Sequence, residues 1–322
     1  MLGLFDMMFM LGSLAVSLTV LVPLVGTLVR FRAHYNPKGL QLDSEGDVQP
    51  HTGPVISSYI GMLRRVHRIE GWPGLYKGLM PTLLSTLLIT VFLMMFLSES
   101  NLRSGKYSAP DGGAVGVLFY SIFAMLVSLP QVIITNRAIT TPHKLPYFNA
   151  IYSLRILLTP TERRRPWILY LTPGLLATQV AHIAYVIIFL RSIRQLLLPE
   201  LANPGMPRTE EISPAKLVIF FVIALLSTVI LAPLEVIAIR LSIQRNHAAP
   251  EFNSISQEED GDAEEATEYA GADEDVIGLR TDREPYIGMV DCAKRIVDEE
   301  GWRALYRAWW LTTLGSLSGA FS

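Results

Sequence analysis

Long apolar runs are the feature that most constrains how this chain can fold. They cover about residues 4–29, 81–97, 114–134, 173–190 and 215–239, and a shorter apolar end follows Trp310. A helix needs roughly 20 apolar residues to cross a hydrocarbon core of about 30 Å. Because lipid offers no hydrogen-bond partners, helices satisfy the backbone of such runs. The sequence therefore predicts an all-α membrane protein.

The composition excludes several other classes of protein. Hydrophobic residues make up 50% and charged residues 17%, whereas soluble globular chains carry about a quarter charged residues. The 27 basic residues do not exceed the 29 acidic ones, which argues against nucleic-acid binding. Cys292 is the single cysteine, so the sequence predicts no disulfide framework and no thiolate metal cluster. We expect no cofactor and no metal.

The first apolar run could also be read as a secretory signal peptide. It lacks a basic beginning, contains Asp6, and extends beyond the apolar length of such a peptide. We expect it to be the first transmembrane helix, with a cleaved or anchoring signal as the alternative.

Amphipathic stretches lie between the apolar runs, at about residues 60–69, 147–158 and 286–297. The order is span, amphipathic helix, span, repeated three times. A fixed period is the signature of repeated structural units. The sequence therefore predicts six transmembrane helices in three pseudo-repeats, 1–105, 106–205 and 206–322, with short amphipathic helices between the spans.

A proline recurs near the end of each odd-numbered span, at a spacing of about 105 residues. The three are Pro23, Pro130 and Pro233. Proline inside a helix removes a backbone hydrogen bond and clashes with the preceding turn, so we expect a kink at each. An arginine follows each proline seven residues later: Arg30, Arg137 and Arg240.

A second motif follows downstream. It reads Glu70-Gly-Trp-Pro-Gly-Leu-Tyr-Lys-Gly, is echoed by Glu300-Gly-Trp-Arg-Ala-Leu-Tyr-Arg, and returns more faintly around Trp167. With the Pro/Arg blocks, this pattern resembles the mitochondrial carrier family over essentially the whole chain, as a divergent, degenerate member. The resemblance implies a six-helix carrier fold and a solute transporter rather than an enzyme. The alternative for the arginines is a generic basic cap that reaches the lipid headgroups.

In the resembled family, acidic and basic residues after the prolines form a ring of ion pairs that closes the pore. The acidic positions here are Val25, Val132 and Glu235, and the first basic positions are Leu28, Thr135 and Ala238. Only Glu235 keeps its charge, so the ring cannot form as such. Glu235 is either a gate or ion site, or a residual structural ion pair with one of the arginines.

The resemblance places the substrate contact points on the even-numbered spans, at about Ser85, Ala177, Thr178 and Gly315. None is charged. The most polar residues nearby are Gln179 and His182, which lie three apart and share a helix face. They are candidates for solute binding, and hydrogen bonding between helices is the alternative.

An acidic loop over residues 246–284 lies between the fifth span and the last amphipathic segment. Its acidic residues greatly outnumber Arg280 and Arg283, so we expect a solvated, disordered loop, or alternatively a docking site for a protein partner. The last apolar segment is too short to span a membrane unless residues 303–310 join it.

The sequence thus leads to two functional hypotheses. The first is a mitochondrial transporter that moves a small solute by alternating access, with membrane lipid as its environment and the inner membrane as the family default. The alternative is a non-transporting outer-membrane protein that acts in fusion, membrane organisation or protein insertion. No zinc-protease, nucleophile-elbow or phosphate-loop motif supports an enzyme.

Overall fold

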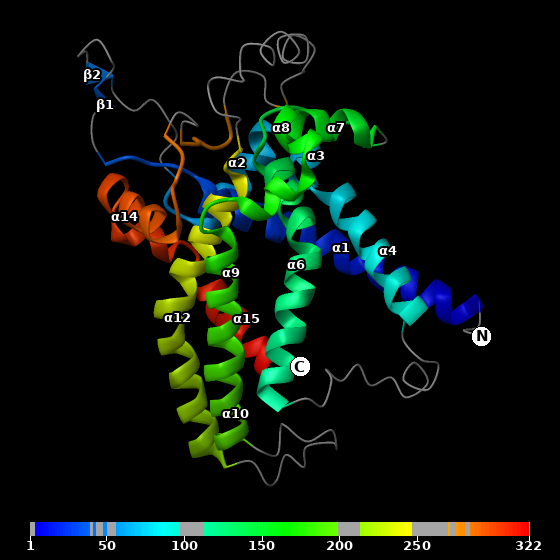
Figure 1. The fold of residues 1–322 in the computed structure, drawn as a ribbon, viewed down its shortest axis with the longest axis vertical. Helices are drawn as coiled ribbons and strands as arrows, with labels where there is room; N and C mark the ends of the chain where they lie inside the picture. The colour runs from blue at the N-terminus through cyan, green and yellow to red at the C-terminus, as the bar shows by residue number, and fades with distance from the viewer. Residues whose placement is uncertain are drawn as a thin grey trace. The chain divides into compact units, whose positions relative to one another are not determined.

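The computed structural model describes residues 4–38, 41–42, 48–49, 56–96, 113–147, 149–198, 213–246, 270, 275–280 and 284–321. These residues are predominantly helical (Figure 1). The helices are α1 (Leu4–Ala33), α2 (Tyr59–Ile69), α3 (Gly71–Leu75), α4 (Leu79–Phe96), α6 (Gly113–Thr140), α7 (Ala150–Leu157), α8 (Pro160–Arg164), η1 (Pro166–Leu171), α9 (Leu175–Ala184), η2 (Tyr185–Leu190), α10 (Arg191–Leu197), α12 (Pro214–Ile243), α14 (Met289–Glu299), η4 (Trp302–Tyr306) and α15 (Trp309–Phe321). Strands β1 (Gln41–Leu42) and β2 (Val48–Gln49) pair antiparallel, with Leu42 opposite Val48.

Four helical stretches are long and apolar enough to cross a membrane. Among the described residues these are Gly12–Ala33, Ala114–Thr140, Leu175–Leu197 and Pro214–Ile243. They match the first, third, fourth and fifth predicted spans, so the prediction of a multi-pass helical membrane protein is confirmed. Pro23, Pro130 and Pro233 all lie inside these helices, as the repeat pattern required.

The second and sixth predicted spans correspond to shorter helices. α4 has 18 residues and α15 has 13. Residues 303–308 do not join α15, because η4 is a 3₁₀ turn and Ala308 has a positive φ of 57°, which interrupts the helix. The three-repeat, six-span arrangement therefore stays a prediction.

The chain forms two compact units, each built from three segments. The first unit comprises Met1–Phe92, Pro130–Leu169 and Ser242–Pro285. In it, α2 buries Met62 and Val66 completely, on the apolar face that its periodicity predicted. The Tyr59 hydroxyl donates to the carbonyl of Leu24, and the Tyr76 hydroxyl to that of Thr19. These bonds hold the amphipathic segment against α1.

The second unit comprises Leu93–Leu129, Tyr170–Leu241 and Tyr286–Ser322. In Figure 1, α12 runs beside α9 and α10, and the Tyr185 hydroxyl lies 3.2 Å from the Ser227 hydroxyl between them. The hydroxyls of Thr228 and Thr313 connect α12 to α15 at 2.9 Å. Three helices of this unit therefore share polar contacts inside their apolar faces.

Part of the predicted acidic loop is packed. Residues 275–280 lie in the first unit, where Val276 and Ile277 are buried and Arg65 donates to the carbonyls of Asp275 and Val276. Gly278 exchanges hydrogen bonds with His34 and Tyr35. The prediction of a disordered loop over 246–284 is therefore wrong for this stretch, because its apolar Val-Ile pair has a site to fill. Most of the rest lies outside the described residues.

Candidate functional site

The three arginines that follow the prolines are buried and paired with glutamates. Arg30 is 2.7 Å from Glu70, and Arg240 is 2.8 Å from Glu300. Arg137 binds Glu162 through both terminal nitrogens, at 2.6 and 2.9 Å. Their exposed fractions are 1%, 4% and 2% for Arg30, Arg137 and Arg240. The alternative of a basic cap among lipid headgroups is thus wrong, because these side chains point into protein.

Each of the three glutamates lies at or next to the end of a short helix. Glu70 and Glu300 are the C-caps of the amphipathic helices α2 and α14. Glu162 belongs to a capping box at the start of α8, where Thr159 and Glu162 bind each other's backbone N–H. Each ion pair therefore fastens a surface helix to the end of a long apolar helix.

Two of the pairs include a second cation, seven residues after the glutamate. Lys77 lies 2.5 Å from Glu70, and Arg307 lies 2.9 Å from Glu300. Burial lowers the pKa of Lys77, and Glu70 only partly restores it. Burial likewise lowers the pKa of Arg307 to about 10 against the attraction of Glu300. Seven residues after Glu162 the chain has Leu169 instead of a cation. Asn246 donates to the carboxylate of Glu162 in its place.

Glu235 occupies a different setting. Its carboxylate accepts a hydrogen bond of 2.6 Å from the Thr312 hydroxyl of α15 and lies 3.5 Å from Nε2 of His182 on α9. The side chains of His182 and Glu235 are 29% and 26% exposed, so the protein covers neither completely. The structure thus brings together two residues that the sequence singled out separately.

A cavity of about 340 Å³ opens beside this pair in the second unit. α12 and α15 contribute Glu235, Thr312, Gly315 and Ser316, and the α9–α10 segment contributes His182, Arg191 and Arg194 with apolar neighbours. Two predicted contact residues, His182 and Gly315, line this cavity. Ala177, Thr178 and Gln179 do not; the buried Thr178 hydroxyl donates to the carbonyl of Gly174 in its own helix.

Arg191 and Arg194 are site residues that the sequence analysis missed. The lining residues of this segment include His182, Val186, Leu190 and Arg194, spaced four apart. In an α-helix each four-residue step passes a full turn by about 40°. The wider π-helical turn η2 offsets this drift and keeps the stripe on one face. π-helical turns are frequent at functional sites, but no motif marked this one.

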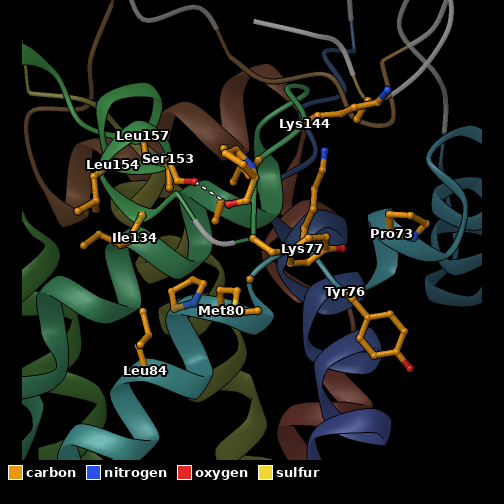
Figure 2. Close-up of a pocket in the computed structure, with 18 of the residues that line it drawn as sticks. Pro73, Tyr76, Lys77, Met80, Leu84, Ile134, Lys144, Ser153, Leu154 and Leu157 are labelled. Carbon is orange, nitrogen blue, oxygen red and sulfur yellow. Dashed lines mark hydrogen bonds between the residues drawn. The ribbon is translucent and has the colours of Figure 1, made fainter.

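A second cavity of about 500 Å³ lies in the first unit and contains Ser85. Figure 2 shows it between Met80, Leu84 and Ile134, with Leu154, Ser153 and Leu157 on one side and Lys77 near Tyr76 on the other. Its walls are mainly apolar. The Ser85 hydroxyl donates to the carbonyl of Thr82, so its hydrogen bond is made within α4. The two predicted contact residues Ser85 and Gly315 line different cavities.

Part of the chain is similar to a known protein family. Residues 213–322, which include α12, α14 and α15, match the family model described as mitochondrial carrier protein. This stretch contains the Pro233/Arg240 block, Glu235 and the Glu300 motif. No curated protein matches the chain.

Proposed function

We propose that this chain, a member of the mitochondrial carrier family by its match over residues 213–322, moves a small solute across a mitochondrial membrane by alternating access. The family supports a carrier-type, multi-pass membrane transporter, and the proposal extends this to six spans in three repeats. The inner membrane is the location we assign.

The observation that carries the proposal is the polar cavity of the second unit. Polar and charged side chains are costly at membrane depth and are kept mainly where they face a solute path or a water-filled space. Here Glu235, His182 and Arg191 converge on one space from two different apolar helical segments. Ligand cavities usually range from about 300 to 1,000 Å³, so this one suits a small solute.

Alternating access needs a contact that can be exchanged between states. The buried Arg–Glu pairs are unsuitable, because separating them would strand charges in apolar surroundings. Glu235 is better suited, since its partners are a hydroxyl and an imidazole and its side chain is 26% exposed. We therefore assign the movable contact to Glu235 and the fixed joints to the arginine pairs.

Transport by the purified full chain in liposomes tests this proposal. Gly315 lines the cavity, and an added Cβ there would meet no atom within 4 Å, so Gly315→Phe should fill the cavity and abolish uptake while the protein still folds. Gly116→Phe is the matched control, because Gly116 in α6 also has open space but does not line this cavity. No uptake of any solute by the wild type would contradict the proposal.

Sub-mitochondrial fractionation tests the location. Recovery with inner-membrane markers after the outer membrane is stripped is the expected result. Recovery only with outer-membrane markers would favour the alternative role in fusion, membrane organisation or protein insertion.

A further inference from the structure

A short stretch of the acidic insert is packed against the end of the first apolar helix. This stretch, residues 275–280, lies in the first unit and is called the strap below. The backbone N–H of Tyr35, just after α1, donates to the carbonyl of Gly278 at 2.8 Å. The N–H of Gly278 in turn donates to Nδ1 of His34 at 3.3 Å. The strap therefore pairs with the chain where it leaves α1.

The amphipathic helix α2 holds the strap as well. Arg65 donates through Nε to the carbonyl of Val276 and through Nη2 to that of Asp275, both at 3.1 Å. Val276 and Ile277 are each only 7% exposed. Hydrogen bonds from a charged donor are stronger than those between neutral groups. Arg65 is therefore the polar side chain on which the docking of the strap most depends.

The strap completes a circuit of contacts near the ends of three long apolar helices. Lys77 joins the α1–α3 segment to α6, because its Nζ lies 2.9 Å from the carbonyl of Thr141 just after that helix. Asn136 joins α6 to the end of α12, because its Nδ2 donates to the Ser242 hydroxyl at 2.8 Å. The strap then joins the chain that follows α12 back to α1 and α2. Each of the three segments thus contacts the other two.

The joints of this circuit differ in how readily they can open. Lys77 also pairs with Glu70, beside Arg30, so moving it away would leave charges unbalanced in a buried cluster. The strap instead offers backbone groups to each of the partners named above, and Arg65 is partly exposed. Water can replace these partners when the strap leaves, so its release costs less than separating a buried ion pair.

We propose that residues 275–280 are a detachable strap, which restrains the ends of α1 and α2 when docked and lets the circuit open when released. Docking of the strap does not depend on transport, whereas its role as a restraint on the transport cycle rests on the function proposed above. The N–H of Ala270 donates to the carbonyl of Pro142, so the insert is also tethered beside α6. A tether raises the effective concentration of the strap at its site, so docking is readily reversed and restored.

Cysteine labelling measures whether the strap is docked. Val276→Cys places a thiol in the strap, and Ser57→Cys places one at an exposed position of the same unit. Purified full-length protein in detergent is treated with a maleimide, and the labelled peptides are quantified by mass spectrometry. Val276→Cys should react about tenfold more slowly than Ser57→Cys, or slower still, because labelling needs the strap to open. Equal rates would overturn the proposal.

Substitution of Arg65 tests what holds the strap. Arg65→Gln should speed the labelling of Val276→Cys about tenfold or more, as the loss of one charged hydrogen bond predicts. Arg65→Lys should have a smaller effect, because the charge remains without the planar fork. Arg64→Gln is the matched control, since Arg64 is the exposed neighbour on the same helix. An unchanged labelling rate in Arg65→Gln would overturn the assignment of Arg65.

The native cysteine reports whether the variants stay folded. Cys292 is completely buried in α14, so it should remain unlabelled throughout. If Cys292 is labelled in Arg65→Gln, that variant has unfolded, and the milder Arg65→Lys decides the question in its place.

A thiol on α6 tests whether release of the strap opens the circuit. Ala138 is 1% exposed, so Ala138→Cys should be protected in the otherwise wild-type protein. If the strap restrains the helix ends, Arg65→Gln should also speed the labelling of Ala138→Cys, and Arg64→Gln should not. Faster labelling at Val276→Cys alone would show a local contact and would overturn the role of the strap as a restraint.

Uptake into liposomes separates the strap from the transport function. Arg65→Gln should take up solute faster than the wild type, by at most the factor by which the labelling of Ala138→Cys rises. If the wild type takes up no solute, the transport proposal fails and the labelling still decides whether the strap docks. If the wild type takes up solute but Val276→Cys reacts as fast as Ser57→Cys, transport stands and the strap is overturned.

Discussion

Arg137 and Glu162 form a two-point ion pair between α6 and α8, with Nη1 2.6 Å from one carboxylate oxygen and Nη2 2.9 Å from the other. Both residues are buried, and Arg137 also donates to the carbonyls of Leu157 and Gln244. The pair thus joins α6 and the α7–α8 region to the residues that follow α12, all within the first unit.

Breaking this pair should strongly destabilise the protein. Arg137→Gln or Glu162→Gln each leaves a buried charge without its partner, which costs about 3–5 kcal/mol. The double variant should lose less free energy of unfolding than the two single variants lose together, because neither buried charge remains. Denaturant unfolding in detergent measures the change. Arg155→Gln is the control, because Arg155 is an exposed arginine on α7. An equally large loss of stability in Arg155→Gln would contradict a special role for the buried pair.

The same carboxylate predicts an acid dependence. Burial raises the pKa of Glu162, but hydrogen bonds and charge from Arg137, with N–H groups of Asn246 and Thr159, outweigh it, and the net pKa lies below its usual value. The stabilisation is therefore fully present above about pH 4.3, the pKa of an unfolded glutamate, and is lost as the pH falls through the lower folded value. The stability difference between wild type and Glu162→Gln should narrow over this range. A difference that stays constant with pH would exclude this linkage.

Glu300 neutralises two cations, Arg240 and Arg307. Glu300→Gln leaves two like charges facing each other in a buried site, whereas Arg307→Gln keeps the Arg240–Glu300 pair. We therefore expect Glu300→Gln to lower the melting temperature more than Arg307→Gln does. Asp298→Asn removes an exposed carboxylate of the same helix and should have little effect. Equal decreases in melting temperature in Glu300→Gln and Arg307→Gln would show that Arg307 is not a secondary partner of Glu300.

Gly174 should not tolerate a side chain. It begins α9 with φ +78°, and an added Cβ would lie 2.2 Å from the backbone nitrogen of Met289. Gly174→Ala therefore meets both the left-handed conformation, about 1–2 kcal/mol, and a backbone clash that forces α9 away from α14. Gly288→Ala, across the same contact, has open space and an extended φ, so it should melt like the wild type. Thermal unfolding compares the two.

The long apolar helices and the residues where they begin followed from sequence because the properties that specify them are local, whereas their ends lie beyond the predicted ones. A run of about 20 apolar residues predicts a span wherever it occurs, and α1, α6 and α12 lie where their runs predicted them. The helical spacing of apolar residues among basic ones likewise predicted α2, whose buried Met62 and Val66 are four residues apart. The break at Ala308 was not predicted, because its positive φ is determined by packing rather than by residue type.

The sequence identified only some of the residues of the candidate site. His182, Glu235 and Gly315 were selected for separate reasons, and nothing in their spacing indicated that they line one cavity. Arg191 and Arg194, which line the same cavity, were not selected from the sequence at all. A π-helical turn has no dependable sequence signature, so their direction could not be predicted.

The sequence by itself determined that the chain is a helical membrane protein with three Pro/Arg blocks, because apolar length and repeated motifs depend only on neighbouring residues. Only the tertiary structure decided what those arginines and polar residues do. Arg30 and Glu70 are 40 residues apart, Arg240 and Glu300 are 60 apart, and Glu162 stood in no recognised motif. Which charges meet depends on how helices pack around one another. This packing places the three arginines in buried ion pairs with glutamates, and it brings Glu235 beside His182 at a cavity.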